Sequence, residues 1–149
     1  MNDESDISLE DALGIGVDIV EIRRFRDLTE DSPFFHRVFT EQELDYCLRY
    51  SDASPHLAAI FAGKEAVVKA LRGKTAISMK SIEICHEPNG MPRVKLCQLP
   101  EIKILLSLAH SKEYAVAIAL LIPPSDITSE PALQNLLNER ISELLQGCG

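Results

Sequence analysis

The strongest indication of chemistry in this sequence is KEAVVK, residues 64–69, within a largely apolar, helix-forming stretch from His56 to Lys74. Glu65 and Lys69 are four residues apart, so a helix places them on one face about one turn apart. Lys64 lies about 100° from Glu65 around the axis and would line the same cleft if the helix were partly buried. A carboxylate flanked by two ammonium groups suits a magnesium-bound phosphate, because the metal prefers oxygen ligands and phosphate needs cations. The same Glu-to-Lys spacing is also a common way to solvate a helix surface.

A second carboxylate stands in an apolar segment near the N-terminus. Residues 12–22, ALGIGVDIVEI, are mostly small or β-branched and predict a strand, which Asp18 interrupts. A lone carboxylate in a buried strand is costly unless it is paired, hydrogen-bonded or bound to a metal. The alternative is that Asp18 is a capping or turn residue following Gly16 and Val17.

The net charge of −8 comes from the two ends of the chain. Residues 1–12 carry five acidic and no basic side chains, and residues 124–149 carry four acidic side chains against one arginine. Basic and acidic residues balance between them, so we expect no nucleic-acid partner. The densest positive cluster is Arg23, Arg24 and Arg26, which is either a docking patch or a solvated face.

The hydrophobic pattern predicts an α+β fold in which a mostly antiparallel sheet packs around the central helix. Thr40 and Glu43 have the spacing of a capping box and start a helix that ends at Tyr50. Asn89-Gly90 is a strong hairpin signal. The other elements that we expect are strands over 81–87, from the turn through 96, over 104–109 and over a central 114–121, with an amphipathic helix over 131–146.

Size and composition indicate one domain of 149 residues with an aliphatic core, since only 5% of the residues are aromatic. We expect an acidic tail over 1–12, a folded domain over 13–122, and a linker and helix over 123–149 that packs on its own sheet or on a neighbouring subunit. The sequence shows no membrane span, no signal peptide and no zinc-type cysteine spacing. These features favour a cytoplasmic protein with reduced thiols and no membrane contact.

Three segments, taken together, resemble a known family. GIGVDIVEIRRF (14–25), FAGKEAVVKAL (61–71) and SLAHSKEYAVAIAL (107–120) are similar to the signature segments of the holo-acyl-carrier-protein synthases, the small 4′-phosphopantetheinyl transferases. The segments RVFTEQEL (37–44) and NGMPRV (89–94) also resemble the family, in the same order, so that the similarity spans about residues 13–122.

The resemblance implies transfer of the 4′-phosphopantetheine arm from coenzyme A to a serine of an apo acyl carrier protein, which releases adenosine 3′,5′-bisphosphate. Asp18 and Glu65 would hold Mg²⁺, and Lys69, with Lys64, would neutralise the phosphates. His110 would lie at the nucleotide pocket, unless it only caps the end of its strand. The base is either Glu65 or a metal-bound water.

The resemblance also implies a homotrimer with active sites between subunits, and a carrier that docks on Arg24 with help from Arg23 and Arg26. The chain departs from the family pattern at Ile60, where the family has an arginine, and in the turn after Leu71, which has lost glycines. These departures leave two other hypotheses, a non-catalytic relative that binds coenzyme A or a carrier protein, and a purely structural oligomer.

Overall fold

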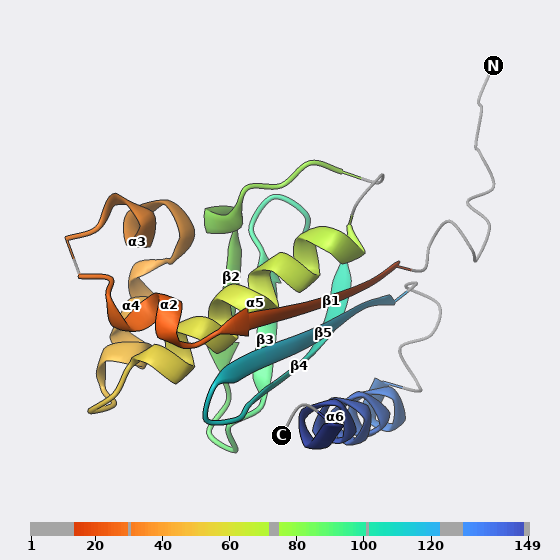
Figure 1. Cartoon of the computed structure of the whole chain (residues 1–149). Coiled ribbons are helices and arrows are strands. Elements are labelled where there is room, and N and C mark those ends of the chain that lie inside the picture. Colours follow the sequence, from red (N-terminus) through yellow and green to blue (C-terminus); the bar gives the residue numbers. More distant parts are fainter. Residues whose placement is uncertain (1–13, 30, 72–74, 101, 123–129, 148–149) are drawn as a thin grey trace.

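A computed structural model of the chain describes residues 14–29, 31–71, 75–100, 102–122 and 130–147. Its helices and strands follow one another with short connections (Figure 1). In chain order they are β1 (Gly14–Glu21), α2 (Arg23–Arg26), α3 (Pro33–Val38), α4 (Glu41–Leu48), α5 (Ser54–Ala70), the 3₁₀ turn η1 (Met79–Ser81), β2 (Ile82–His86), β3 (Pro92–Leu96), β4 (Lys103–His110), β5 (Tyr114–Ile122) and α6 (Glu130–Gly147).

Two antiparallel sheets form the β-structure. The larger has the order β1–β5–β4, and β2 and β3 form a separate hairpin. The sequence therefore predicted the central place of β5 correctly, and its apolar side chains are covered on both faces. The hairpin turns at Gly90, whose φ of 86° favours glycine. The α+β fold with an antiparallel sheet around a central helix is confirmed, although the strands divide into two sheets.

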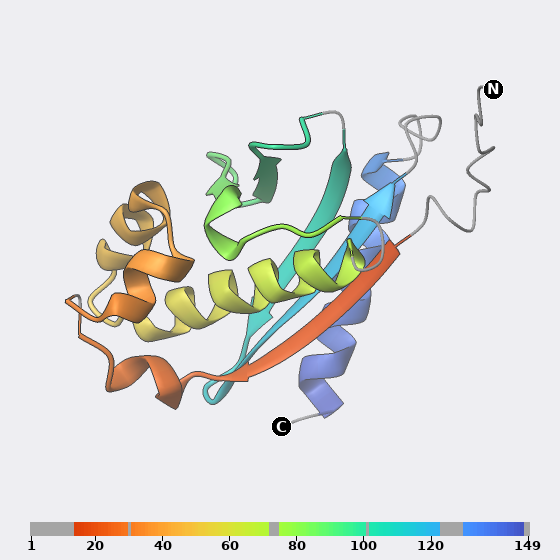
Figure 2. The ribbon, with the colours of Figure 1, turned by 90° about the horizontal axis from the view of Figure 1, so that it is seen from above.

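Helix α5 lies on one face of the larger sheet and α6 on the other (Figure 2). Gly14 and Gly16 allow α5 to approach β1 closely, because a side-chain carbon at either position would collide with the carbonyl oxygen of Ala70 or Ala66. Because Gly14 lies against Ala70 and Gly16 lies against Ala66, β1 and α5 run in opposite directions. This register decides which side chains of the helix face Asp18.

Helix α6 packs on the sheet of its own chain, which is the first of the two placements that the sequence left open. Leu137 and Ile141 are buried against the outer side chains of β4 and β5. Gln134 donates to the Leu106 carbonyl over 2.9 Å, and Ser107 donates to Asn138 over 2.5 Å. Beyond the reach of α6, the outer face of β1 keeps three apolar side chains exposed: Ile15 (65%), Val17 (45%) and Ile19 (52%).

The N-terminal helices form a cap at one end of α5 (Figure 1). All five phenylalanines of the chain pack together there, with ring centroids 5.6–6.5 Å apart; they are Phe25, Phe34, Phe35, Phe39 and Phe61. Aromatic groups at these separations stabilise a core beyond their buried area. Across the residues described here, none of the helices is both long and apolar enough to cross a membrane.

Some element boundaries differ from the sequence prediction. The capping box of Thr40 and Glu43 is present, but its helix ends at Leu48. The central helix starts two residues earlier than expected and ends at Ala70, and the predicted terminator Gly73 lies outside the described residues. Helix α3 was not predicted at all. Its signal was Ser32 before Pro33, since the Ser32 hydroxyl accepts from the Phe34 amide over 3.3 Å.

Candidate active site

Asp18 lies in the middle of β1, opposite Ala117 of β5, so the interpretation of Asp18 as a turn residue is wrong. Its neighbours on the same face are Gly16 and Val20, which contact α5 or the core, and its side chain therefore points to the helix side of the sheet. Lys69 of α5 places its Nζ 3.0 Å from Asp18 Oδ1 and 2.9 Å from the Val17 carbonyl oxygen. The structure thus brings together two of the residues predicted from the sequence.

Glu65 lies one helical turn before Lys69 on the same face of α5. Because β1 and α5 run in opposite directions, with Gly16 against Ala66, the next inward residue of the strand, Asp18, lies near the turn that carries Glu65. Glu65 is half-buried, and within the described ranges no cation or hydrogen-bond donor is paired with its carboxylate. Two carboxylates from two elements therefore lie beside one lysine. We call Asp18, Glu65 and Lys69 the carboxylate cluster.

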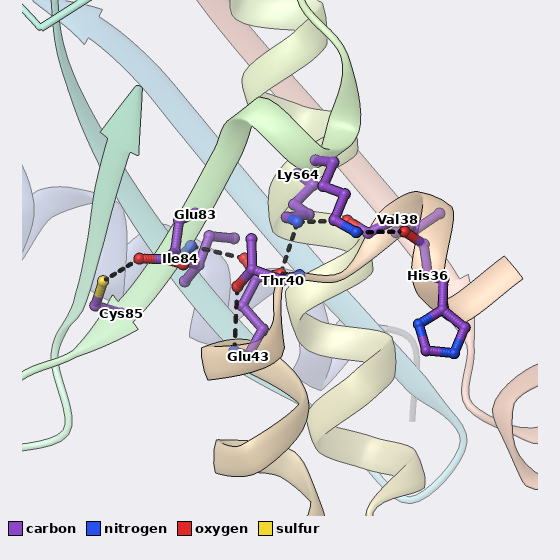
Figure 3. A network of polar contacts seen from close by, with 9 residues as sticks. His36, Val38, Thr40, Glu43, Lys64, Glu83, Ile84 and Cys85 are labelled. Atoms are coloured by element: carbon purple, nitrogen blue, oxygen red, sulfur yellow. Dashed lines mark hydrogen bonds and ion pairs between the residues drawn. The ribbon is translucent and has the colours of Figure 1, made fainter. Parts of the chain in front are cut away.

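Lys64 does not join the carboxylate cluster. Its side chain is completely buried, and its Nζ lies 2.6 Å from Glu43 Oε2 and 2.5 Å from the Val38 carbonyl oxygen (Figure 3). The structure thereby corrects the prediction that Lys64 neutralises phosphates, because the ammonium group faces α4 and is closed off from solvent. The error arose because the spacing fixes the angle between Lys64 and Glu65 but does not say which of them faces a partner element.

The carboxylate of Glu43 binds more than Lys64. It also accepts hydrogen bonds from the Thr40 amide, over 2.9 Å, and from the Ile84 amide of β2, over 2.8 Å (Figure 3). Burial raises the pKa of Glu43 and lowers the pKa of Lys64, while the charge of each partner opposes the effect on the other. Because each charged group has several partners, this network fastens α4, α5 and β2 together.

His110, the last residue of β4, lies in a cavity with two histidines that the sequence analysis did not single out. The cavity has a volume of about 190 Å³ and is also lined by His56 of α5, His86 of β2 and Ile60. His110 Nδ1 lies 3.3 Å from the Ser111 carbonyl oxygen. A signal for His56 was available, because His56 and Ile60 are four residues apart and share a helix face. His86 gave no such signal, since the hairpin brings it to the cavity from a distant part of the sequence.

Burial lowers the pKa of His56, and the neighbouring His110 lowers it further, although Asp52 acts in the opposite direction. Burial also lowers the pKa of His86, with a smaller contribution from His56. Both imidazoles are held by stacking: His86 on Tyr46 at 4.0 Å between centroids, and His56 on Tyr50 at 3.5 Å. The surroundings of His56 and His86 therefore favour neutral imidazoles in fixed orientations.

Comparison with known proteins identifies the family. The model of the 4′-phosphopantetheinyl transferase superfamily matches residues 14–119. The chain belongs to this superfamily. Two relatives named holo-[acyl-carrier-protein] synthase, from Thermodesulfovibrio yellowstonii and Chlamydia felis, are 41% and 45% identical to it over 110 and 116 residues. These matches cover 72% and 71% of this chain and 96% and 93% of the relatives.

Solved structures agree with the assignment to the phosphopantetheinyl transferases. A holo-(acyl-carrier-protein) synthase from Bacillus anthracis, in complex with CoA (3′,5′-ADP), matches with a TM-score of 0.64 and 32% identity over 72% of this chain and 94% of that one. The Helicobacter pylori enzyme in complex with coenzyme A matches with 0.63 and 28%, over 72% and 99%. The prediction that this chain is an enzyme of the holo-acyl-carrier-protein synthase family is confirmed.

As a 4′-phosphopantetheinyl transferase, the chain has two carboxylates in the carboxylate cluster that could hold a metal ion. Nowhere in the described part of the chain do three or more His, Cys, Asp or Glu side chains form a metal-binding group. Magnesium is commonly held by one or two carboxylates, with substrate phosphates and water completing its coordination. Asp18 and Glu65 match that number of carboxylates.

The three arginines of α2, which the sequence suggested as a carrier-docking patch, are all exposed but differ in their contacts. Arg23 Nε lies 2.6 Å from Glu21 Oε2, and the Arg24 guanidinium lies 5.7 Å from the centre of the Phe61 ring. Arg23 and Arg26 line a hollow of about 300 Å³ that also contains Lys112 and Tyr114. This part of the transferase surface is therefore rich in cations, although Glu21 and Glu113 lie in the same hollow.

Proposed function

We propose that the chain transfers the 4′-phosphopantetheine arm of coenzyme A to a serine hydroxyl of an apo acyl carrier protein. The observation that carries the proposal is the carboxylate cluster between β1 and α5, in which Asp18 and Lys69 are in contact and Glu65 lies on the same side. Both named relatives and both solved structures described above belong to synthases of this kind. The two carboxylates of the cluster support magnesium as cofactor, and the solved structures with bound coenzyme A support it as substrate.

In the proposed reaction the serine oxygen attacks the phosphorus that carries the pantetheine arm. The bond from that phosphorus to the bridging oxygen breaks, adenosine 3′,5′-bisphosphate leaves, and the serine proton passes to a base. Lys69 remains 42% exposed while it contacts Asp18, so its ammonium group is available to the phosphates. Asp18 and Glu65 would hold Mg²⁺, which supplies positive charge to the pyrophosphate. Glu65 is also a candidate for the base, because its carboxylate has no cation partner among the described residues.

The test is mass spectrometry of an apo acyl carrier protein after incubation with the chain, coenzyme A and magnesium. We expect a mass gain of one phosphopantetheine arm that disappears with a chelator. Asp18→Asn and Glu65→Gln should lower the rate by roughly 10²-fold or more, since each removes a metal ligand. Glu139→Gln, an exposed site on α6, is the matched control. Coenzyme A binding without any transfer would instead support the hypothesis of a non-catalytic relative, which Ile60 prompted in the sequence analysis.

The carrier-docking role of Arg23, Arg24 and Arg26 belongs to the same proposal, because carriers of this type are acidic. The cation-rich hollow beside α2 supports it. We further propose the homotrimer that the sequence suggested, and a cytoplasmic location. The exposed apolar strip of Ile15, Val17 and Ile19 supports self-association, since a row of three such side chains on an edge strand favours burial. Light scattering on the eluting protein would give three times the chain mass if this is correct.

A further inference from the structure

The ammonium group of Lys69 occupies a position on Asp18 that any other cation bound there would also need. Its Nζ lies 3.0 Å from Asp18 Oδ1 and 2.9 Å from the Val17 carbonyl oxygen, so it binds two oxygens of β1. Carboxylate and carbonyl oxygens are also the ligands that hard divalent cations prefer. The Asp18 side chain is 16% exposed. Because so little of the carboxylate is open to solvent, a metal ion and the Lys69 ammonium would compete for it.

The formal charge of the carboxylate cluster depends on Lys69. Asp18 and Glu65 contribute two negative charges and Lys69 contributes one positive charge, which leaves a net charge of −1. A divalent cation that joined the cluster would meet the ammonium at close range, where charges of the same sign repel each other strongly. Without the ammonium, the two carboxylates would match the charge of a divalent cation.

Lys69 can leave Asp18 without opening the core, because its side chain is 42% exposed. A lysine side chain is a flexible stem, and the three donors of its ammonium group rotate to a new acceptor. Lys64 of the same motif is the opposite case, since its ammonium is completely buried against Glu43. Of the two lysines in the motif, Lys69 is therefore the one that can exchange partners.

We propose that Lys69 is an internal counter-ion of Asp18, which keeps divalent cations off this carboxylate until a phosphate group accepts the ammonium. The inference rests on the proposed function, which assigns a divalent cation and the phosphates of coenzyme A to this cluster. It adds that Lys69 opposes metal binding in the protein without substrate. Metal and coenzyme A should then bind cooperatively, since each favours the departure of Lys69 from Asp18.

The first experiment measures metal binding by the whole chain without coenzyme A. Mn²⁺ is the probe, because carboxylate ligands suit it as they suit Mg²⁺, and the free ion is counted by electron paramagnetic resonance. Lys69→Met should bind Mn²⁺ about tenfold more tightly than the wild type, because a neighbouring positive charge is removed. Lys69→Arg keeps the charge and should bind as weakly as the wild type. Lys112→Met removes an equal charge at the exposed β4–β5 turn and should change little.

A double variant shows where the ion enters. Asp18→Asn combined with Lys69→Met should lose the gain in affinity, whereas Mn²⁺ held by acidic side chains elsewhere in the chain would be unaffected. Mg²⁺ should displace the Mn²⁺ that Lys69→Met has gained. If Lys69 only helped to build the metal site, its replacement would weaken Mn²⁺ binding, so the direction of the change separates the two roles.

The same titrations with coenzyme A measure the cooperativity, after subtraction of the Mn²⁺ that coenzyme A binds without protein. Coenzyme A should tighten Mn²⁺ binding to the wild type, and by a several-fold smaller factor in Lys69→Met, whose affinity is already high. Unchanged or weaker Mn²⁺ binding in Lys69→Met, or a gain that survives Asp18→Asn, would overturn the inference. Pantetheinyl transfer by the wild type would in that case leave the proposed function intact. Absence of Mn²⁺ binding in every variant, with and without coenzyme A, would overturn both.

Discussion

Two adjacent side chains of α5 enter opposite environments. Lys64 is buried against α4 with Glu43, and Glu65 is half-buried on the side of α5 that carries Lys69. About 100° of helical rotation separates them, which is sufficient for one to be structural and the other functional. Within one motif, Lys64 therefore fixes the orientation of α5 about its axis, and Glu65 and Lys69 are placed beside Asp18.

The structural role of Lys64 leads to a prediction about stability. Lys64→Met should lower the free energy of unfolding by about 3–5 kcal/mol, because it leaves the carboxylate of Glu43 buried without its counter-charge. The double variant Glu43→Leu/Lys64→Met should recover part of the loss, since both charges are then absent. Urea unfolding followed by circular dichroism measures both. Lys112→Met, at the exposed β4–β5 turn, is the control and should change little. If the Lys64→Met protein had normal stability but bound coenzyme A weakly, Lys64 would contact the phosphates after all, and the structural role would be wrong.

The half-buried His56 and His86 predict how the free energy of unfolding depends on pH. The folded-state pKa of His56 and His86 lies below the unfolded value of about 6.5, mainly through burial. Their contribution to stability is therefore complete above about pH 6.5 and is lost as the pH falls through the folded-state values. Urea midpoints should decline between pH 7.5 and pH 5, and His86→Phe should decline less steeply. The same slope in the variant would show that other groups cause the acid sensitivity.

At the scale of elements, the proposed docking role of helix α2 can be tested separately from the reaction. Arg23→Glu combined with Arg26→Glu should raise the KM for an acidic carrier about tenfold or more and leave kcat nearly unchanged, because charge reversal opposes association. The effect should shrink in 0.5 M salt, where the Debye length falls to a few ångströms. Arg140→Glu on α6, on the opposite face of the sheet, is the matched control. A change in kcat with KM unaltered would place these arginines in the reaction itself.

Most elements could be predicted because their signals are local. The Thr40 capping box, the Asn89-Gly90 turn and the apolar run of β5 each depend on a few neighbouring residues. The surroundings of Lys64 and the meeting of His56 with His86 depend on how α4 and the β2–β3 hairpin dock on α5. Such contacts join residues more than 20 positions apart, and periodicity carries no information about them. The contact between Asp18 and Lys69 also joins residues that are distant in the sequence, and only the family resemblance suggested it.

For the whole molecule, the two faces of the larger sheet have different tasks. The α5 face carries the carboxylate cluster and the cavity lined by His56, His86 and His110. On the α6 face, Leu137 and Ile141 cover a separate apolar cluster of sheet residues, which are Leu105, Val116, Ile118 and Ile122. The family match ends at residue 119, before α6 begins. The helix is therefore an addition to the family's common segment and is remote from the α5 face.

This division predicts that stability and activity can be changed independently. Ile141→Ala should lower the free energy of unfolding by about 2–5 kcal/mol, because Ile141 is 2% exposed and truncation leaves a cavity above the sheet. Leu144→Ala, 47% exposed on the same helix, should cost far less. At a temperature where both variants stay folded, kcat and KM for pantetheinyl transfer should equal those of the wild type. A loss of activity in the folded Ile141→Ala protein would mean that packing on the α6 face affects the carboxylate cluster. Strand β5 is the most direct connection, because it contacts both helices.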